Sequence, residues 1–367
     1  MKTPAARSAV PRRRFLGALA ASCALAAFVR PSPTRAQDER EDTTYVLSSP
    51  ERREQIRRRV SAPLVAALRE QADAGLARLP HPRAVVHTQG LLPHEQDRDA
   101  SVQSQEDWRQ TLLQAIAGCV TGKDNYTAKA VTYIEAWIPG YVSSSNPIDE
   151  ADLVDLLLGF DFVKARLSEA TIAHARALGS QMAQGYLGER RVGDPSTGLN
   201  NWQSHRVKLA TAGAFLAGDA ALIAASREAF MAHAMRNIDA NGLTYDFDQR
   251  DAIHYVVYDL EPLLLAASMA AAHGENWYAA APLQGRLAAA LRWLEPYASG
   301  ARPHEEFVHS TVGFDARRAA AHVEGYSGLW RREEARNVYG IAAHLDPQFT
   351  PIAAALEPQP VVRALFA

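Results

Sequence analysis

The sequence predicts an all-α protein made of roughly ten or more helices in a single domain. Apolar residues recur at three- and four-residue spacing in one stretch after another, and alanine, a strong helix former, is frequent between them. The alternation of apolar and polar residues that is typical of strands is nearly absent. Because the helices are many and their connections short, we expect antiparallel pairs stacked into a bundle, a solenoid or a closed toroid.

Residues 1–36 are expected to be an export signal that takes no part in the fold. Arg12 and Arg13 form a twin arginine ahead of Phe15, and the apolar run at 18–29 is too short to span a bilayer. Such a signal directs a protein out of the cytoplasm. We therefore expect a periplasmic or secreted protein with no membrane insertion after signal removal.

The folded part is expected to span residues 51–367, after a flexible tether at 37–50 that is polar, charged and poorly periodic. Ser168 and Asp219 are typical helix N-caps, and Gly218 fits a helix end. No signature recurs at a period of roughly 34 to 47 residues, which weakens an interpretation as a protein-binding repeat array. Helices are predicted at 51–78, 105–120, 124–137, 148–166, 169–187, 200–217, 219–238, 250–273, 276–296 and 333–345.

Charge and cysteine content exclude several classes of protein. The full chain carries 39 basic and 41 acidic side chains, and residues 1–36 hold seven of the basic ones and no acidic one. The exported chain would therefore be acidic, which argues against nucleic acid as a partner. Only Cys119 remains after signal removal, so no intramolecular disulfide can form, and no group of Cys and His has the spacing of a metal site.

A polar face is predicted on the helix at 250–273. Residues four apart lie close together around a helix, so Arg250, His254 and Tyr258 would align a cation, an imidazole and a phenol. The alternative is the polar side of an ordinary core helix, since tyrosine and histidine are often partly buried.

A second polar cluster, Asn-Asn-Trp-Gln-Ser-His at 200–205, opens the predicted helix 200–217. Asn201 and His205 are four residues apart and would be neighbours on that helix. The alternative is that Asn200 or Asn201 only caps the helix. The two polar clusters together favour a functional site.

Three segments carry a resemblance to a known family: Asn-Pro-Ile-Asp-Glu at 146–150, the asparagine pair at 200–201, and Ala-Ile-His-Tyr-Val-Val-Tyr at 252–258. In order and spacing they resemble the alginate-lyase superfamily of polysaccharide lyases, and they are similar to families 5 and 38, which include alginate and β-glucuronan lyases. The resemblance covers about residues 87–314. It implies an (α/α) toroid, an incomplete α/α barrel, whose cleft takes an acidic polysaccharide and cleaves it by β-elimination without a metal or an organic cofactor.

The resemblance also implies roles for single residues. It places the family's paired asparagines on residues 200–201, its arginine on Arg250 and its catalytic tyrosine on Tyr258. The family-5 pattern has histidine directly after the asparagine pair, whereas this sequence has Trp202 there and its nearest imidazole is His205. One residue is also inserted between the arginine and the Ala-x-His-Tyr element.

β-Elimination next to a uronate removes the weakly acidic C5 proton, so the neighbouring carboxylate must be neutralised. The amide of Asn200 or Asn201, an imidazolium and the Arg250 guanidinium would hydrogen-bond that carboxylate and stabilise the enolate-like intermediate. In mannuronate and glucuronate the C5 hydrogen and the C4 oxygen share one side, so Tyr258 alone would serve as base and acid. In guluronate they lie on opposite sides, and His205 would be a separate base. A phenol has a pKa of about 10, so Arg250 or a protonated His254 would have to favour the phenolate.

Substrate contacts are expected from basic and aromatic side chains, many of them on the long loops at 80–104 and 299–332. Arg206 and His309 are predicted first as partners of substrate carboxylates, and Trp202 as a platform for a sugar ring. Asn200 and His254 complete the predicted binding set together with His94, and candidates of the same kinds are Arg98, Arg302, His304, Arg317, Arg318 and Trp330.

Two other functions remain open from the sequence. A glycoside hydrolase on a similar helical toroid could use two of Asp246, Asp248 and Asp251, because inverting hydrolysis needs two carboxyl groups that flank the bond with room for water. A non-catalytic periplasmic polysaccharide-binding protein is the other alternative, and it would need no reactive phenol.

Overall fold

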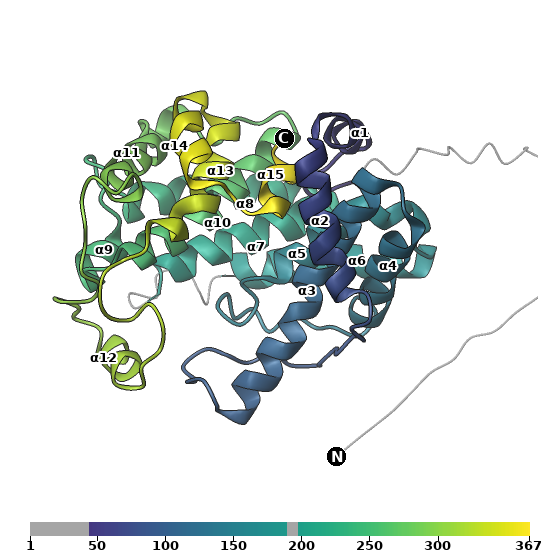
Figure 1. Ribbon diagram of the computed structural model, residues 1–367, viewed down its shortest axis with the longest axis horizontal. Helices are drawn as coiled ribbons and strands as arrows, with labels where there is room; N and C mark the ends of the chain where they lie inside the picture. Colours follow the sequence, from purple (N-terminus) through teal and green to yellow (C-terminus); the bar gives the residue numbers. More distant parts are fainter. Residues whose placement is uncertain (1–43, 189–196) are drawn as a thin grey trace, which may run out of the picture. The chain divides into compact units, whose positions relative to one another are not determined.

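The computed structural model describes residues 44–188 and 197–367, and every regular element in these two stretches is a helix (Figure 1). The prediction of an all-α, single-domain protein is confirmed. The α-helices are α1 Pro50–Arg59, α2 Ala62–Gly75, α3 Gln96–Thr121, α4 Asp124–Trp137, α5 Leu153–Val163, α6 Glu169–Leu187, α7 Asn201–Ala217, α8 Ala220–Asn237, α9 Tyr245–Arg250, α10 Ile253–Ala272, α11 Arg286–Ala298, α12 Gly313–Ala320, α13 Arg336–Leu345, α14 Thr350–Leu356 and α15 Pro360–Leu365, and the short 3-10 turns are η1 Lys164–Arg166, η3 Ala281–Leu283, η4 Arg332–Ala335 and η5 Pro347–Phe349.

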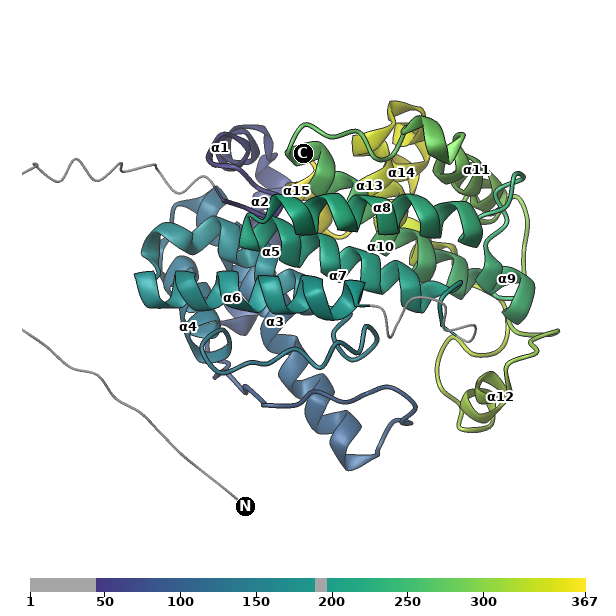
Figure 2. The same ribbon diagram turned by 180° about the vertical axis from the view of Figure 1, so that it is seen from behind.

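Helices that follow one another in the chain pack in pairs. α3 packs on α2, α4 and α5, while α7 packs on α6, α8 and α10, and α10 also packs on α13. Figures 1 and 2 show α7 and α10 side by side in the middle of the helical body. α10 is long and apolar enough to span a bilayer by length and composition, but 78% of that stretch is buried inside the protein, as expected of a core helix.

Two glycines let α6 and α7 approach closely. A Cβ atom on Gly213 would lie 2.5 Å from the carbonyl oxygen of Gly179, and a Cβ on Gly179 would lie 2.7 Å from the carbonyl oxygen of Gly213. A larger residue at either position would push the backbones apart. This contact fixes α7, whose first turn carries the asparagine pair.

The helix ends follow the predicted signals at several places. Ser168 accepts a hydrogen bond from the Thr171 backbone, and the Asp219 carboxylate accepts from the backbone at the start of α8. Gly218 ends α7 in the left-handed conformation, with φ 67°. These are local interactions, which explains why the sequence alone predicts them.

Other boundaries differ from the prediction. The stretch 51–78 is two helices, because the chain is extended at Val60 and Pro63 sits in the first turn of α2. α3 begins at Gln96, nine residues before the predicted start at 105. The stretch predicted at 276–296 contains only the short 3-10 turn η3 before α11 begins at Arg286, after the left-handed Gly285.

The predicted helix at 250–273 is also two helices. α9 ends at Arg250, Asp251 adopts a left-handed conformation with φ 49°, and α10 starts at Ile253. The prediction that Arg250 shares one helical face with Tyr258 is therefore wrong. Asparagine and aspartate tolerate this conformation better than most residues, so the break needs neither glycine nor proline.

The tether prediction does not hold for residues 44–50. The backbone amides of Val46, Leu47 and Ser48 each donate a 2.8 Å hydrogen bond to the Asp161 carboxylate, and the Val46 side chain is fully buried. These residues belong to the helical domain. The predicted signal at 1–36 and the rest of the tether lie outside the described residues.

Two long segments project from the same side of α7 and α10, as Figures 1 and 2 show. The first arm comprises residues 80–98, ahead of and into α3, and the second arm comprises residues 299–332, which include α12. The second arm was expected to be a loop throughout. Both arms are held by hydrogen bonds at their roots, as described below.

Candidate active site

A cleft of about 620 Å³ lies where α7 and α10 begin and is flanked by the two arms. Asn201, Trp202, Arg250, His254 and Tyr258, all predicted from the sequence, line it. The first arm contributes Thr88, Gln89, Gly90, Leu91, Leu92, Pro93 and Arg98, the second arm contributes Phe314, Arg317, Arg318, Val323 and Tyr326, and Ile148 and Tyr255 complete the lining.

Tyr258 and His205 lie together, but only Tyr258 faces the cleft. Their ring centroids are 4.3 Å apart. His205 is 3% exposed, and neither of its ring nitrogens makes a hydrogen bond within the described residues. Burial lowers the pKa of His205 well below its usual value, and the nearby charge of Lys208 lowers it further. His205 is therefore a neutral imidazole packed behind the phenol.

The surroundings of Tyr258 favour the neutral phenol. Burial raises the pKa of Tyr258 above its usual value, Asp152 and Tyr255 raise it further, and the positive charge of Arg318 opposes this shift. The expectation that Arg250 favours a phenolate at Tyr258 is not met, because the Arg250 guanidinium lies 3.9 Å from the ring centroid of Tyr255 instead. Arg318 is the cation that acts on the Tyr258 hydroxyl.

The two asparagines do different things. Asn200 caps α7, since its side-chain oxygen accepts a 3.2 Å hydrogen bond from the Trp202 backbone, so the capping alternative holds for this residue. Asn201 lines the cleft, and its backbone and side-chain nitrogens donate to the two oxygens of Asp246 at 2.6 and 2.7 Å. Asn201 is thus the asparagine placed to meet a substrate.

Arg250 reaches the cleft from the end of α9. Its Nε lies 3.5 Å from Asp246 Oδ1, and its Nη1 forms an ion pair with Asp315 on the second arm. The two carboxylates fix the guanidinium beside the Tyr255 ring. His254 does share a face of α10 with Tyr258: their rings are nearly parallel, at 9°, with centroids 6.4 Å apart.

Glu306 on the second arm caps α10 and was not predicted. Its carboxylate accepts hydrogen bonds from the backbone amides of Ile253 at 2.8 Å and His254 at 3.1 Å. Ala252, at the N-cap position of α10, offers no side-chain acceptor. Glu334 approaches the His254 ring, with 3.1 Å between Oε2 and Nδ1. The start of α10, and with it the floor of the cleft, is held by a segment about fifty residues further along the chain.

A sequence model of the alginate lyase family matches residues 43–304, which is most of the chain. The chain belongs to the alginate lyase family. It is accordingly a polysaccharide lyase, and the enzyme interpretation holds over that of a non-catalytic binding protein. None of the curated proteins matches this chain.

Solved structures support the fold of this lyase. It is similar to an alginate lyase from Bacteroides ovatus, with a TM-score of 0.67 and 16% identity over 88% of this chain and 99% of that chain. It is also similar to alginate lyase A1-III from Sphingomonas species A1, with a TM-score of 0.59 and 15% identity over 88% and 93% of the two chains. A third similar structure is a histidine-to-alanine variant of A1-III in complex with a tetrasaccharide, with a TM-score of 0.55 and 15% identity over 82% of this chain and 86% of that chain. The predicted (α/α) toroid is confirmed.

Besides Asn200, which caps α7, three predicted binding residues of the lyase do not line the cleft. Arg206 is 2% exposed and donates to the Thr197 backbone oxygen at 2.9 Å, because a position five residues beyond Asn201 faces another side of α7. His309 is exposed and contacts Asp251, with 2.8 Å between Nδ1 and Oδ2. His94 follows the lining residue Pro93, adopts a left-handed conformation with φ 75° and is not part of the lining.

Tyr255, Arg318 and Tyr326 form a cluster in the cleft that sequence reasoning did not assemble. Arg318 Nη1 donates a 2.7 Å hydrogen bond to the Tyr255 hydroxyl, and its guanidinium lies 4.6 Å from the ring centroid of Tyr326. Tyr255 belongs to the family motif, and Arg318 was named only as a candidate carboxylate partner. Their meeting depends on the fold of the second arm, which no local pattern encodes.

The hydrolase alternative finds no carboxylate pair in the cleft. The described residues that line the cleft include four arginines and no aspartate or glutamate. Asp246 is 1% exposed and bound to Asn201, and Asp251 is bound to His309 and to the backbone of the second arm. Inverting or retaining hydrolysis needs two carboxyl groups at the bond, so this cleft is unsuited to it.

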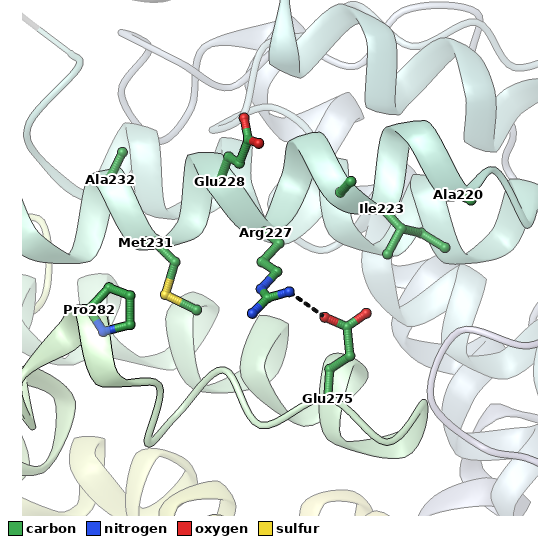
Figure 3. A pocket seen from close by; sticks show the side chains of 9 residues that line it. Ala220, Ile223, Arg227, Glu228, Met231, Ala232, Glu275 and Pro282 are labelled. Carbon is green, nitrogen blue, oxygen red and sulfur yellow. Dashed lines mark ion pairs between the residues drawn. The ribbon is translucent and has the colours of Figure 1, made fainter.

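A second hollow, of about 720 Å³, lies along α8 near η3 and is shown in Figure 3. Its walls are mainly apolar, with side chains such as Ile223, Met231 and Pro282. Its arginine, Arg227, pairs with Glu275 at 3.9 Å. The described residues that line this hollow include no tyrosine, histidine or asparagine, which are the groups that the elimination would use.

Proposed function

We propose that this lyase cleaves a 1,4-linked polyuronate, either the polymannuronate of alginate or β-glucuronan, by β-elimination and leaves 4,5-unsaturated uronate ends. The observation that carries the proposal is a cleft whose described lining residues include Tyr258 and four arginines and no acidic side chain. The whole chain has a formal net charge of −2, so this cleft is a local concentration of positive charge. An acidic polymer is the ligand that such a cleft attracts.

The four arginines are spread over the cleft, which suits a polymer with one carboxylate on each sugar. Arg98 comes from the first arm, Arg317 and Arg318 from the second arm and Arg250 from the floor. Arg317 forms no ion pair within the described residues and lies 5.0 Å from the Phe314 ring centroid. Its charge is therefore available for a substrate carboxylate. The similar solved structures, an alginate lyase and an alginate lyase variant in complex with a tetrasaccharide, support the same ligand class.

In the proposed mechanism Asn201 and Arg250 bind the carboxylate of the sugar that loses its C5 proton. Only one of the two N–H bonds of the Asn201 amide is needed for Asp246, which leaves the other for substrate. Hydrogen bonds to both groups spread the charge that develops on the carboxylate as the C5–H bond breaks. These groups are held in place before the substrate binds, so little reorganisation is required.

Tyr258 then takes the C5 proton and returns a proton to the C4 oxygen as the C4–O bond breaks. The phenol must first be ionised, and Arg318 is the charge that favours this. His205 lies behind the phenol ring and does not line the cleft, so it is not placed as a separate base at the opposite face of the sugar. His254, the imidazole in the lining, shares a face of α10 with Tyr258. One group on one face suits mannuronate or glucuronate, whose hydrogen and leaving oxygen share a side, and disfavours guluronate.

We also propose that the protein acts outside the cytoplasm, after export through a twin-arginine signal at residues 1–36. Large polysaccharides are met in the periplasm or outside the cell, so an export signal agrees with a polyuronate substrate. Fractionation of cells that produce the full chain tests the location: activity in the periplasm or medium is expected, and activity confined to the cytoplasm contradicts it.

The test is a panel of defined polymers: polymannuronate, β-glucuronan and polyguluronate. Ultraviolet absorbance of the 4,5-double bond should rise with polymannuronate or glucuronan, and much more slowly with polyguluronate. New reducing ends without that absorbance would indicate hydrolysis. No product on any of the three polymers would contradict the proposal.

A further inference from the structure

Asp246 lies beneath the cleft and connects two of its groups. It sits in the first turn of α9, which starts where the Thr244 hydroxyl accepts a hydrogen bond from the Phe247 backbone. The Asp246 side chain is 1% exposed and does not line the cleft. It therefore cannot touch a bound polymer, and any effect on the reaction must pass through its neighbours.

Both oxygens of Asp246 bind Asn201. Oδ2 accepts from the Asn201 backbone N–H at 2.6 Å, and Oδ1 accepts from the side-chain Nδ2 at 2.7 Å. Asn201 is the first residue of α7, where the backbone N–H has no partner within the helix. If the amide were rotated by half a turn, its oxygen would face the carboxylate and repel it. The pair of bonds thus fixes both the position and the orientation of the amide.

The same carboxylate also holds Arg250. Asp246 Oδ1 lies 3.5 Å from Arg250 Nε, one helical turn along α9. One buried carboxylate therefore spans the amide and the guanidinium that are proposed to bind the uronate carboxylate. A shift of about 1 Å in such groups can cost about a hundredfold in rate.

We infer that Asp246 is a positioning residue, which orients the Asn201 amide and the Arg250 guanidinium toward the substrate carboxylate. This role rests on the proposed function of the cleft. Asp246, which was first considered as a carboxyl group for hydrolysis, would thus support the elimination reaction.

Three charged groups face Asp246 from the surrounding helices: Arg250 on α9, Asp315 on α12 and Asp259 on α10. Burial raises the pKa of Asp246 to about 6, while the bonds from Asn201 and the charge of Arg250 act against this. Above that value the carboxylate accepts both bonds from Asn201. Below it, protonation removes an acceptor, so activity should fall as the pH drops through about 6.

The experiment compares Asp246→Asn with Asp246→Glu and a matched control, Asp248→Asn. Asp248 lies on the same helix but is exposed, and among the described residues its side chain accepts a hydrogen bond only from Gln249. On the polyuronate that the wild-type enzyme turns over, kcat of D246N should fall about 10- to 100-fold, D246E should recover part of the loss, and D248N should match wild type. The fall in activity near pH 6 should be absent from D246N and present in D248N.

A double variant shows whether Asp246 acts through Asn201. If it does, the two effects should not multiply: adding D246N to Asn201→Ala should lower kcat by a smaller factor than D246N does in the wild-type enzyme, and what remains is the effect through Arg250. Circular dichroism and thermal unfolding must show a folded protein. If D246N does not fold, D246E, whose longer side chain displaces the carboxylate, should still have a lower kcat than D248N.

Two outcomes would overturn the inference: a folded D246N whose kcat and pH profile match those of D248N, or D246N and N201A effects that multiply. These outcomes are distinct from failure of the proposed function, in which the wild-type enzyme itself makes no unsaturated product.

Discussion

At position 205 an imidazole touches the proposed catalytic phenol without reaching the cleft. The contact is ring against ring, at 4.3 Å between centroids, and both nitrogens of His205 lack hydrogen-bond partners among the described residues. A base needs a nitrogen within hydrogen-bond distance of the proton that it removes. In this geometry His205 packs against the Tyr258 ring, and in the proposed mechanism Tyr258 alone removes the C5 proton and protonates the C4 oxygen.

His205→Gln tests this assignment. The variant should keep kcat within about tenfold of wild type and lose roughly 1–3 kcal/mol of unfolding free energy, because a packed side chain is replaced. His233→Gln is a matched control, since His233 is equally buried but lies on α8 against Ser204. A folded H205Q with a loss of 100-fold or more in kcat would mean that the imidazole takes part in proton transfer.

Sequence reasoning placed five of its ten site residues in the cleft lining, and the reasons for success and failure are local. Asn201 and Tyr258 were found because the motif and the helical phase both point to them. The prediction for Arg206 was wrong because this residue lies on another side of α7. The prediction for His309 was wrong because its side chain contacts Asp251 instead of the cleft. Asp246 and Arg250 lie on α9, whereas Asn201 lies on α7. Their contact therefore depends on how the two helices pack, which the sequence of either helix alone does not predict.

Among the elements, the break between α9 and α10 depends on distant contacts. The Asp251 backbone oxygen accepts from Phe307, and the Asp251 carboxylate accepts from the His309 backbone. These hydrogen bonds stabilise the left-handed conformation of Asp251, a position at which the sequence has no glycine to predict it. The helix predicted at 250–273 began one residue before this break, and no helix was predicted over 245–249. Helix class was predictable from the pattern, whereas this boundary was not.

Glu306, at the root of the second arm, should make stability depend on pH. Burial raises the pKa of Glu306 from 4.5 to about 8, so its neutral form is favoured in the folded protein. That stabilisation is fully present below pH 4.5 and is lost as the pH rises through about 8. Glu306→Gln resembles the neutral form, so wild type should lose stability relative to E306Q between pH 5 and 8.5.

Denaturant unfolding of both proteins at the two pH values measures this difference. The exposed neighbour provides the control, because Glu305→Gln should follow the wild-type pH dependence. A constant difference between wild type and E306Q across this range would contradict a buried, easily protonated carboxyl group at the start of α10.

Asp149 anchors the first arm in a corresponding way. Its Oδ1 accepts from the backbone amides of Thr88 and Gln89, each at 2.7 Å, and both of these residues line the cleft. Asp149→Ala removes the acceptor, which costs about 1–3 kcal/mol, and KM should rise about tenfold with a smaller change in kcat. Asp149→Asn retains an oxygen for the same two bonds and should stay close to wild type. Equal KM values for D149A and D149N would show that the anchor does not shape the cleft.

In the molecule as a whole, binding of the polymer and proton transfer depend on different groups. The described residues of the cleft supply four arginines from the floor and both arms, within a chain whose formal net charge is −2. The binding free energy of a polymer is therefore spread over many contacts, and the loss of the Tyr258 hydroxyl oxygen should weaken binding only slightly. Proton transfer, in contrast, depends on that single oxygen.

Turnover and binding by Tyr258→Phe, measured on the polyuronate that the wild-type enzyme cleaves, test the central claim most directly. Tyr278→Phe is the matched control, because the Tyr278 hydroxyl contacts Asp346 away from the cleft. We predict that Y258F loses about 10²- to 10⁴-fold in kcat, judged by ultraviolet absorbance, and that its Kd by calorimetry stays within about threefold of wild type. A Y258F enzyme that still produces unsaturated ends at the rate of Y278F would contradict the account.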